Sequence, residues 1–232
     1  MRFLRWLHRW TSLVLVLQVI IWCVSGFYFS WQGHQSLAAH DYFQPVSTSA
    51  ISQPLQPLSQ AQLKNHADLL RVSAREVAGQ PQWVLQQPDG DLYLQANGEP
   101  WQTSIEQARA VAEASYTGSA AVVGVDYLPA PEELIGQQSA VYRVQFADEL
   151  ETRAYVDATS GELLAHRNSS WWLSDWMFRL HFMDYTGERD FNNLLMTAAA
   201  LLAFWFALSG FILLVREVRS GRMWRTRKSR RA

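Results

Sequence analysis

Histidine side chains are the groups of this chain that are best suited to chemistry. An imidazole titrates near neutral pH, so it can transfer protons, and its neutral form binds metals through either ring nitrogen. His181 lies among bulky apolar residues within residues 176–185, shortly before a long apolar run. His34 follows another such run, which His8 precedes. What these histidines can bind together depends on which of them lie at the same membrane surface.

Two uncharged apolar runs determine the class of protein. They cover residues 11–31, which are 21 residues, and residues 194–215, which are 22. As helices, both are long enough to cross a hydrocarbon layer of about 30 Å. We therefore expect two transmembrane helices that flank a polar segment.

The distribution of charge predicts the orientation. Eleven of the 20 Lys and Arg residues lie before the first run or after the second. These two end segments contain a single acidic residue, Glu217. By the positive-inside rule, both termini are cytoplasmic and the central segment lies on the outer side. In a bacterium this predicts an inner-membrane protein with a periplasmic domain. The basic C-terminal tail predicts anionic membrane lipid, and not nucleic acid, as its partner.

The first run has an alternative interpretation as a cleaved signal peptide, with small residues at 36–39. The apolar region of a signal peptide has about 7–15 residues, so the greater length here favours an uncleaved anchor. The single cysteine, Cys23, lies inside this run, so no disulfide can form within the chain. The outer segment must therefore fold through its own core.

The central segment predicts an α+β domain. Residues 43–59 are rich in Pro, Ser and Gln, as in a linker. A helix is expected at residues 59–77, and the alternating runs of residues 83–101 predict a hairpin. A capping box begins at Ser104, and an apolar helical face continues to Tyr116. Strands are expected at residues 120–128, 141–146, 152–157 and 162–165.

Two pieces of this domain are alike in sequence. Residues 93–99 and residues 155–162 both contain a strand end that runs into a Gly-Glu turn. This likeness favours two helix-plus-hairpin units, the first one degenerate, packed into one domain. The alternative is two unrelated hairpins with similar turn chemistry.

Residues 141–165 resemble a PepSY module, with a strand, a polar turn and a second strand that ends in Asp-x-x-Ser-Gly-Glu. The helical ends resemble a narrower group, the PepSY-associated transmembrane family. The motifs that carry this resemblance are Leu7-His8-Arg9-Trp10, Ser25-Gly26, Arg179-Leu180-His181 and Ser209-Gly210.

The resemblance implies a role in iron acquisition. Larger members of the family have four or more spans and are linked to the reduction of ferric siderophores, and some bind haem b through histidines at their transmembrane helices. With two spans and no recognisable flavin or nicotinamide motif, this chain would need redox partners at both ends. PepSY modules also occur in peptidase propeptides, where they are associated with inhibition.

Haem iron in a membrane electron carrier usually binds two imidazoles from different helices. His34 and His181 are expected on the outer side at a similar depth, so we predict them as the axial ligands of haem b. The alternative is that His181 binds no cofactor and is an ordinary amphipathic residue of an interfacial helix. His8 is a weaker candidate, because the cytoplasmic end of the second span offers no facing histidine. It would need a second copy of the chain or a partner, and otherwise anchors its helix.

The remaining polar residues are expected to be structural. We expect His66 and His166 at the surface, and an Asp157 turn in which Gly161 adopts positive φ. Ser25-Gly26 and Ser209-Gly210 are expected to let other helices approach, which favours a membrane subunit or a homo-oligomer as partner. No catalytic residue and no metal site is predicted.

The predicted fold is membrane α+β, in which two transmembrane helices flank a periplasmic PepSY-like domain of helices packed on antiparallel hairpins. We expect a haem-binding or accessory electron-transfer subunit and not an autonomous enzyme. The alternative is a membrane-tethered module that binds or restrains a periplasmic protein without a cofactor. The predicted segments are a cytoplasmic N-terminus (1–10), a first span (11–32), a linker (33–58), a degenerate unit (59–103), a PepSY-like unit (104–167), an interfacial segment (168–190), a second span (191–215) and a basic cytoplasmic tail (216–232).

Overall fold

The structure is a computed structural model, and it describes residues 2–46, 51–59, 63, 68–134, 136–187 and 190–220. It has two compact units. The helical unit comprises Met1–Trp31 and Asp175–Ala232, and the β-rich unit comprises Gln32–Ser174. We describe the two units separately.

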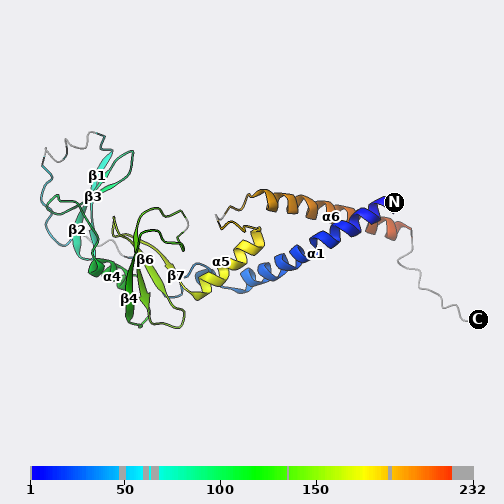
Figure 1. The fold of residues 1–232 in the computed structure, drawn as a ribbon, viewed down its shortest axis with the longest axis horizontal. Helices are drawn as coiled ribbons and strands as arrows, with labels where there is room; N and C mark the ends of the chain where they lie inside the picture. The colour runs from blue at the N-terminus through cyan, green and yellow to red at the C-terminus, as the bar shows by residue number, and fades with distance from the viewer. Residues whose placement is uncertain are drawn as a thin grey trace, which may run out of the picture. The chain divides into compact units, whose positions relative to one another are not determined.

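The helical unit contains the two long helices, α1 (Arg2–Trp31) and α6 (Leu194–Arg219). Both are long and apolar enough to cross a membrane. They pack side by side, with the beginning of α1 and the end of α6 at the same end of the pair (Figure 1). The helix α1 begins at Arg2, before the apolar run that starts at residue 11. At the beginning of α6, Asn193 caps the helix by accepting a hydrogen bond from the Met196 amide at 2.8 Å.

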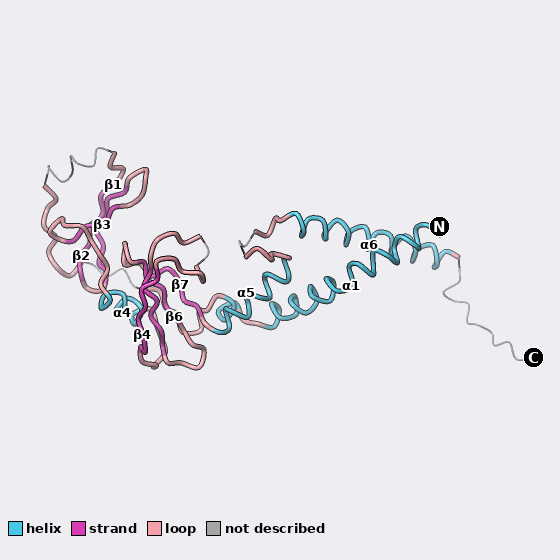
Figure 2. Tube along the Cα trace, in the orientation of Figure 1, coloured by secondary structure: helices cyan, strands magenta, loops and turns pink. Residues whose placement is uncertain are grey.

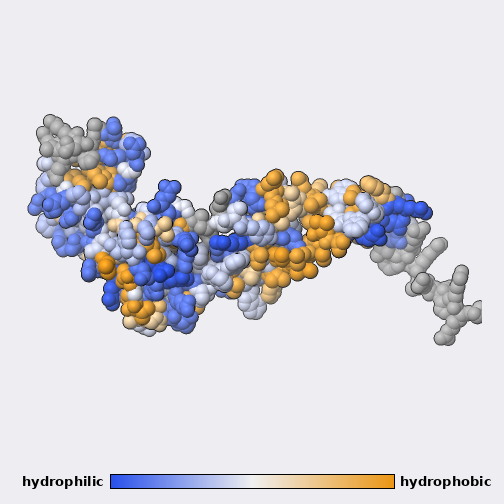
Figure 3. Space-filling view, in the orientation of Figure 1, coloured by the Kyte–Doolittle hydropathy of each residue, from blue (hydrophilic) through white to orange (hydrophobic). Residues whose placement is uncertain are grey.

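The surface of this helix pair is apolar, as a helix in lipid requires. Figure 3 shows hydrophobic residues over the middle of α1 and α6, and hydrophilic residues at the beginning of α1. Leu13, Leu17, Leu201 and Phe204 are among the large side chains that are more than 60% exposed in the chain alone. These two helices flank a β-rich segment in the sequence, which confirms the predicted membrane α+β class.

The helix α5 (Ser169–Phe182) leads from the β-rich unit into the helical unit. A helix was expected here, and the structure confirms it. Its second half contacts α1, because Trp22 Nε1 donates a hydrogen bond to the carbonyl oxygen of His181 at 2.7 Å. The location of α5 at a membrane surface stays a prediction.

The β-rich unit begins with the short helix α2 (His34–Leu37), followed by a strip along residues 43–59. In the described part of this strip, Ser52 and Gln56 hydrogen bond to Glu76 and Ala96, so the strip lies on the surface of the unit. A three-stranded antiparallel sheet then has the order β1 (Arg71–Val77), β2 (Gln80–Gln86) and β3 (Leu92–Gln95).

The helix expected at residues 59–77 is wrong where the structure can test it, because Arg71–Val77 is the strand β1. The physical reason is the turn that follows. Ala78 and Gly79 have φ values of 51° and 76°, so they form a two-residue turn with two left-handed residues, which is typical of a tight hairpin. This turn pairs Val77 with Gln80 and fixes the register of β1 on β2. Residues 60–62 and 64–67 lie outside the described residues.

The second half of the β-rich unit contains the predicted helix and antiparallel strands. The helix α4 (Ile105–Ala114) packs on one face of an antiparallel meander, as Figure 2 shows. Its capping box is confirmed, because Ser104 and Gln107 exchange side-chain and backbone hydrogen bonds. The meander has the order β4 (Val122–Leu128), β5 (Val141–Phe146), β6 (Arg153–Asp157) and β7 (Leu163–Arg167), close to the predicted strands.

One core lies between α4 and this sheet. Its buried side chains are apolar and come from both elements and from the first sheet, and they include Ala108, Ala112, Val144, Val156 and Val77. The two Gly-Glu turns are also alike in conformation, with φ values of 83° at Gly98 and 74° at Gly161. The first predicted unit differs, because its sheet has three strands and residues 71–77 of its expected helix form β1.

Candidate functional site

Of the predicted ligands, His181 is held by contacts of both its ring and its backbone. It lies in the last turn of α5, and its Nδ1 is 2.8 Å from Ser25 Oγ on α1. The ring lies edge-on to Phe29 and Phe182, with ring centroids 5.6 Å and 5.0 Å away. The helix α1 therefore holds both the backbone and the ring of His181.

The protonation state of His181 suits a metal ligand. Burial lowers the pKa of the His181 imidazole below its ordinary value, so the neutral ring is the favoured form near pH 7. Iron and other transition metals bind neutral imidazole. Because Nδ1 is already bonded to Ser25, Nε2 is the ring nitrogen that remains for such a bond. The donor chemistry of His181 therefore fits a haem iron.

His8 lies at the other end of the helical unit, in the first turns of α1. Its Nδ1 is 2.7 Å from Ser209 Oγ on α6, and its ring stacks on Phe206 with the centroids 4.6 Å apart. A Cβ atom on Gly210 would lie 3.2 Å from Cε1 of His8, so the glycine leaves room for the ring. This histidine is therefore packed between two helices and is more than a membrane anchor.

His34 is the first residue of α2 and is exposed. It belongs to the β-rich unit, whereas His181 belongs to the helical unit. The pairing of His34 with His181 stays a prediction. His40, six residues further on, is also exposed and stacks on Phe43, with the centroids 4.4 Å apart.

The two Ser-Gly motifs contact histidines of the same chain. The sequence suggested that each would meet a helix of another molecule, because they lie at opposite ends of the spans. The structure instead pairs Ser25 with His181 and Ser209 with His8. The signal was present in the sequence, since Leu-His and Ser-Gly-Phe both occur twice in the same order. These contacts remove the reason for inferring another subunit from the motifs.

The expectation that His166 lies at the surface is wrong. Its side chain is 1% exposed, and its Nε2 is 2.8 Å from Ser115 Oγ at the end of α4. Burial, followed by the nearby His40, lowers its pKa to about 4. His166 lies on the face of β7 that turns toward α4, so its role is to join the helix to the sheet. His66 lies outside the described residues.

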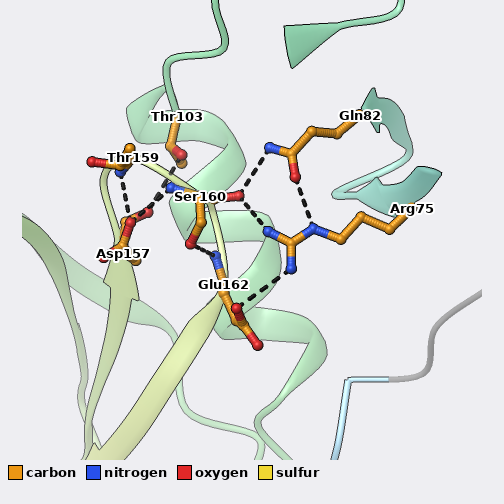
Figure 4. Close-up of polar contacts among 7 residues, drawn as sticks. All are labelled: Arg75, Gln82, Thr103, Asp157, Thr159, Ser160 and Glu162. Atoms are coloured by element: carbon orange, nitrogen blue, oxygen red, sulfur yellow. Dashed lines mark hydrogen bonds and ion pairs between the residues drawn. The ribbon is translucent and has the colours of Figure 1, made fainter. Parts of the chain in front are cut away.

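The Asp157 turn is the second polar cluster of the β-rich unit, and Figure 4 shows its contacts. The Asp157 carboxylate accepts hydrogen bonds from the amides of Thr159 and Ser160 at 2.8 Å and 2.7 Å. Gly161 adopts the predicted positive φ, and a Cβ atom there would lie 2.7 Å from Val77 Cγ1. The predicted structural role of this turn is therefore confirmed.

The same turn joins the two sheets of the β-rich unit. The Ser160 carbonyl oxygen accepts hydrogen bonds from Arg75 Nη2 at 2.9 Å and from Gln82 Nε2 at 3.0 Å (Figure 4). Arg75 Nε in turn donates to Gln82 Oε1 at 2.7 Å. All these groups satisfy one another, so the cluster fixes structure and offers no free reactive group. No sequence pattern indicated a role for Arg75 and Gln82.

Among the described residues, no group of three or more His, Cys, Asp and Glu side chains could hold a metal ion. A haem needs no such group, because the porphyrin supplies four ligands and the protein supplies one or two.

Comparison with known families gives a match over nearly the whole chain. The family model described as the PepSY-associated TM region matches residues 5–232. No curated protein and no solved structure matches the chain.

Proposed function

Because the chain belongs to the PepSY-associated transmembrane family, we propose that it is a haem-binding or accessory electron-transfer subunit of a membrane reductase system. The observation that carries this proposal is the hydrogen bond between Ser25 and His181. It engages Nδ1 of a neutral imidazole and leaves Nε2 as the ligand atom. A metal-ligating histidine is usually held through its other ring nitrogen in this way.

Haem iron held by imidazole would supply a one-electron donor and acceptor. The residues of the chain would bind and orient the group. His181 is the axial ligand in this account, and His34 is the second ligand that the sequence predicts. The aromatic rings of Phe29, Phe178 and Phe182 beside His181 would exclude water and provide apolar contacts.

The proposed partners follow from what the chain lacks. Its sequence has no recognisable flavin or nicotinamide motif, so a separate protein must deliver electrons and another must use them. The positive-inside rule favours an inner-membrane location with both termini cytoplasmic and the β-rich unit periplasmic. Ferric siderophore reduction during iron uptake is the process that the family resemblance suggests, and a membrane subunit or a second copy is the proposed partner.

The test is the haem content of the full chain, purified in mild detergent from haem-replete cells and measured as pyridine haemochrome. We expect near one haem per chain in the wild type. His181→Ala and His34→Ala should both lose haem, whereas His40→Ala, which removes an exposed histidine close to His34, should keep it. Circular dichroism would establish that each variant is folded.

A folded wild-type protein without haem would contradict the proposal. It would favour the alternative, a membrane-tethered module that binds a periplasmic protein through the β-rich unit without a cofactor. Crosslinking from the outer side in intact cells would then identify the bound protein.

A further inference from the structure

His166 is a buried titratable group that the proposed function does not use. Its side chain is 1% exposed, and its Nε2 lies 2.8 Å from Ser115 Oγ. Its Nδ1 is buried as well, and no described residue gives this atom a hydrogen-bond partner. A protonated imidazole has an N–H group at each nitrogen, so the one at Nδ1 would lack an acceptor, whichever tautomer the neutral ring adopts. Protonation of His166 therefore places a charge with an unsatisfied donor inside the unit, which is costly.

A short segment, residues 40–44, covers one side of this ring, and we call it the strap. The Phe43 ring lies edge-on to that of His166, with the centroids 5.3 Å apart, and His40 stacks on Phe43 with the centroids 4.4 Å apart. His40 and Gln44 are exposed, and residues 41–43 are half-buried. On this side, a single layer of chain therefore separates His166 from solvent.

Two backbone hydrogen bonds hold the strap against the end of α4. The Gln44 amide donates to the Ser115 carbonyl oxygen at 2.9 Å, and the Thr117 amide donates to that of Tyr42 at 2.9 Å. The pairing is an isolated bridge and does not extend into a ladder. A contact of this kind can open locally at a lower cost than the unfolding of a sheet.

The strap also contacts the residue that directly precedes α5. Asn168 Nδ2 donates to Asp41 Oδ2 at 2.9 Å, and Asn168 Oδ1 accepts from the Trp171 amide in the first turn of α5 at 2.8 Å. In the chain, the strap follows α1 and α2, whereas α5 precedes α6. The strap therefore joins the two chain segments through which the β-rich unit continues to the long helices.

The charged groups around the ring do not supply the missing acceptor. Burial, and then the charge of His40 on the strap, lower the pKa of His166 to about 4, and Arg167 on β7 acts in the same direction. The Asp148 carboxylate opposes them. It is already engaged, however, by the Tyr116 hydroxyl group at 2.8 Å and by two backbone amides. The ring therefore gains a charge more easily when water reaches it.

From these observations we infer that the strap is an acid-operated release, in which protonation of His166 displaces Phe43 and frees residues 40–44 from the end of α4. Opening lets water solvate the charged ring and satisfy Nδ1. Acid in the compartment that holds the β-rich unit then loosens the connection between the segment after α2 and the beginning of α5. This device goes beyond the proposed function and does not depend on haem.

The pH range of the release follows from linkage. The closed strap favours the neutral ring, so its closure is fully favoured above pH 6.5 and is weakened as the pH falls through 6.5 toward 4. With a pKa of about 4 when closed and an ordinary value of about 6.5 when open, the ratio of open to closed strap should rise about 50- to 100-fold between pH 7.5 and pH 4.5.

Hydrogen exchange of the full chain, prepared without haem in mild detergent and resolved to single amides, measures this opening. The readout is the protection factor, which removes the intrinsic pH dependence of exchange. We expect the protection of the Gln44 and Thr117 amides to fall about 50- to 100-fold from pH 7.5 to pH 4.5. The Phe146 amide, which donates to the Thr152 carbonyl oxygen within the meander, should stay better protected at both pH values. Equal protection of the strap and of Phe146 would show unfolding of the whole unit and would overturn the inference.

Two substitutions test whether His166 is the sensor. His166→Gln stays neutral and keeps a polar group for Ser115, and His166→Leu stays neutral without one. Both should keep the strap amides protected at pH 4.5, and a fall as large as in the wild type in either folded variant would overturn the inference. The wild type alone provides a further test, in which NMR follows the His166 ring through the same pH range. A ring that titrates near pH 6.5 while the strap amides stay protected would also contradict the release.

Discussion

Ser25 of α1 and His181 of α5 are 156 residues apart in the chain, yet Ser25 Oγ lies 2.8 Å from His181 Nδ1. The contact is supported at the backbone, where Trp22 Nε1 donates to the His181 carbonyl oxygen at 2.7 Å and Gln18 Nε2 to that of Leu180 at 3.3 Å. Three consecutive turns of α1 therefore hold the end of α5. An imidazole restrained in this way is positioned before any ligand binds, which is what a metal site requires.

The glycine at position 210 should be required for the packing of α1 on α6. Gly210→Val would place its side chain against the His8 ring, which a Cβ atom alone would approach to 3.2 Å. We expect a loss of about 1 to 3 kcal/mol in unfolding free energy, as for other overpacked sites. Thermal unfolding in detergent, followed by circular dichroism, measures it.

Gly26→Val is the matched control, because a Cβ atom at Gly26 meets nothing within 4 Å. Gly26 follows Ser25 in the same way as Gly210 follows Ser209. Equal destabilisation by the two variants would show that contact with His8 is not what selects glycine at position 210.

Gly161 should be the position of the Asp157 turn at which substitution lowers stability most. Gly161→Ala introduces a Cβ atom 2.7 Å from Val77 Cγ1 into a residue with φ of 74°. Overpacking and left-handed strain together should lower the free energy of unfolding by about 2 to 4 kcal/mol.

Gly79→Ala separates the two causes. Gly79 has φ of 76°, but nothing lies within 4 Å of its Cβ position. It should lose about 1 to 2 kcal/mol from strain alone. If urea denaturation in detergent finds the two variants equally stable, the close approach of Val77 has no energetic role.

Gln82 should stabilise the contact between the two sheets, although it is a polar residue. Its side chain is fully buried and bridges Arg75 and the Ser160 carbonyl oxygen. Gln82→Leu leaves the Arg75 Nε group without its acceptor, so we expect a loss of about 1 to 3 kcal/mol. The exposed Gln95 of β3 is the control, and Gln95→Leu should change the denaturation midpoint little. A neutral Gln82→Leu would contradict the bridging role.

His166 should make the β-rich unit sensitive to acid. Its folded pKa of about 4 lies below the ordinary value of about 6.5, so the folded state favours the neutral ring. The resulting stability is fully present above pH 6.5 and is lost as the pH falls through 6.5 toward 4. The loss over this window is about 3 kcal/mol.

His166→Leu removes this titration. Thermal unfolding between pH 7 and pH 4.5 should show a smaller decrease for the variant than for the wild type. Ser115 remains satisfied in the variant, because its hydroxyl group also donates to the Ala112 carbonyl oxygen at 2.7 Å. Parallel pH profiles for the two proteins would show that His166 is not the titrating group.

Local patterns predicted much of the fold. The two apolar runs, the Ser104 capping box and the alternating strands of the meander all depend on residues close in sequence, and the structure contains each of them. For residues 71–77 the local pattern predicted a helix and was wrong, because the tight turn at Ala78 and Gly79 favours a hairpin. Tertiary pairing with β2 determined the outcome.

The site was predictable only in part. The motif pattern identified His8, His181 and both serines, but their pairing depends on which helices lie together. The burial of His166 likewise depends on the packing of α4 against β7, which no local pattern reports. Arg75 and Gln82 carry no sequence signal, because their partner is a backbone carbonyl group.

The most direct test of the central claim, that His181 is a haem ligand, is the visible spectrum of the purified full chain, recorded oxidised and then reduced with dithionite. The account predicts a Soret band that shifts on reduction, persists in His40→Ala and disappears in a folded His181→Ala variant. A colourless folded wild-type protein, or a spectrum unchanged by His181→Ala, would contradict it.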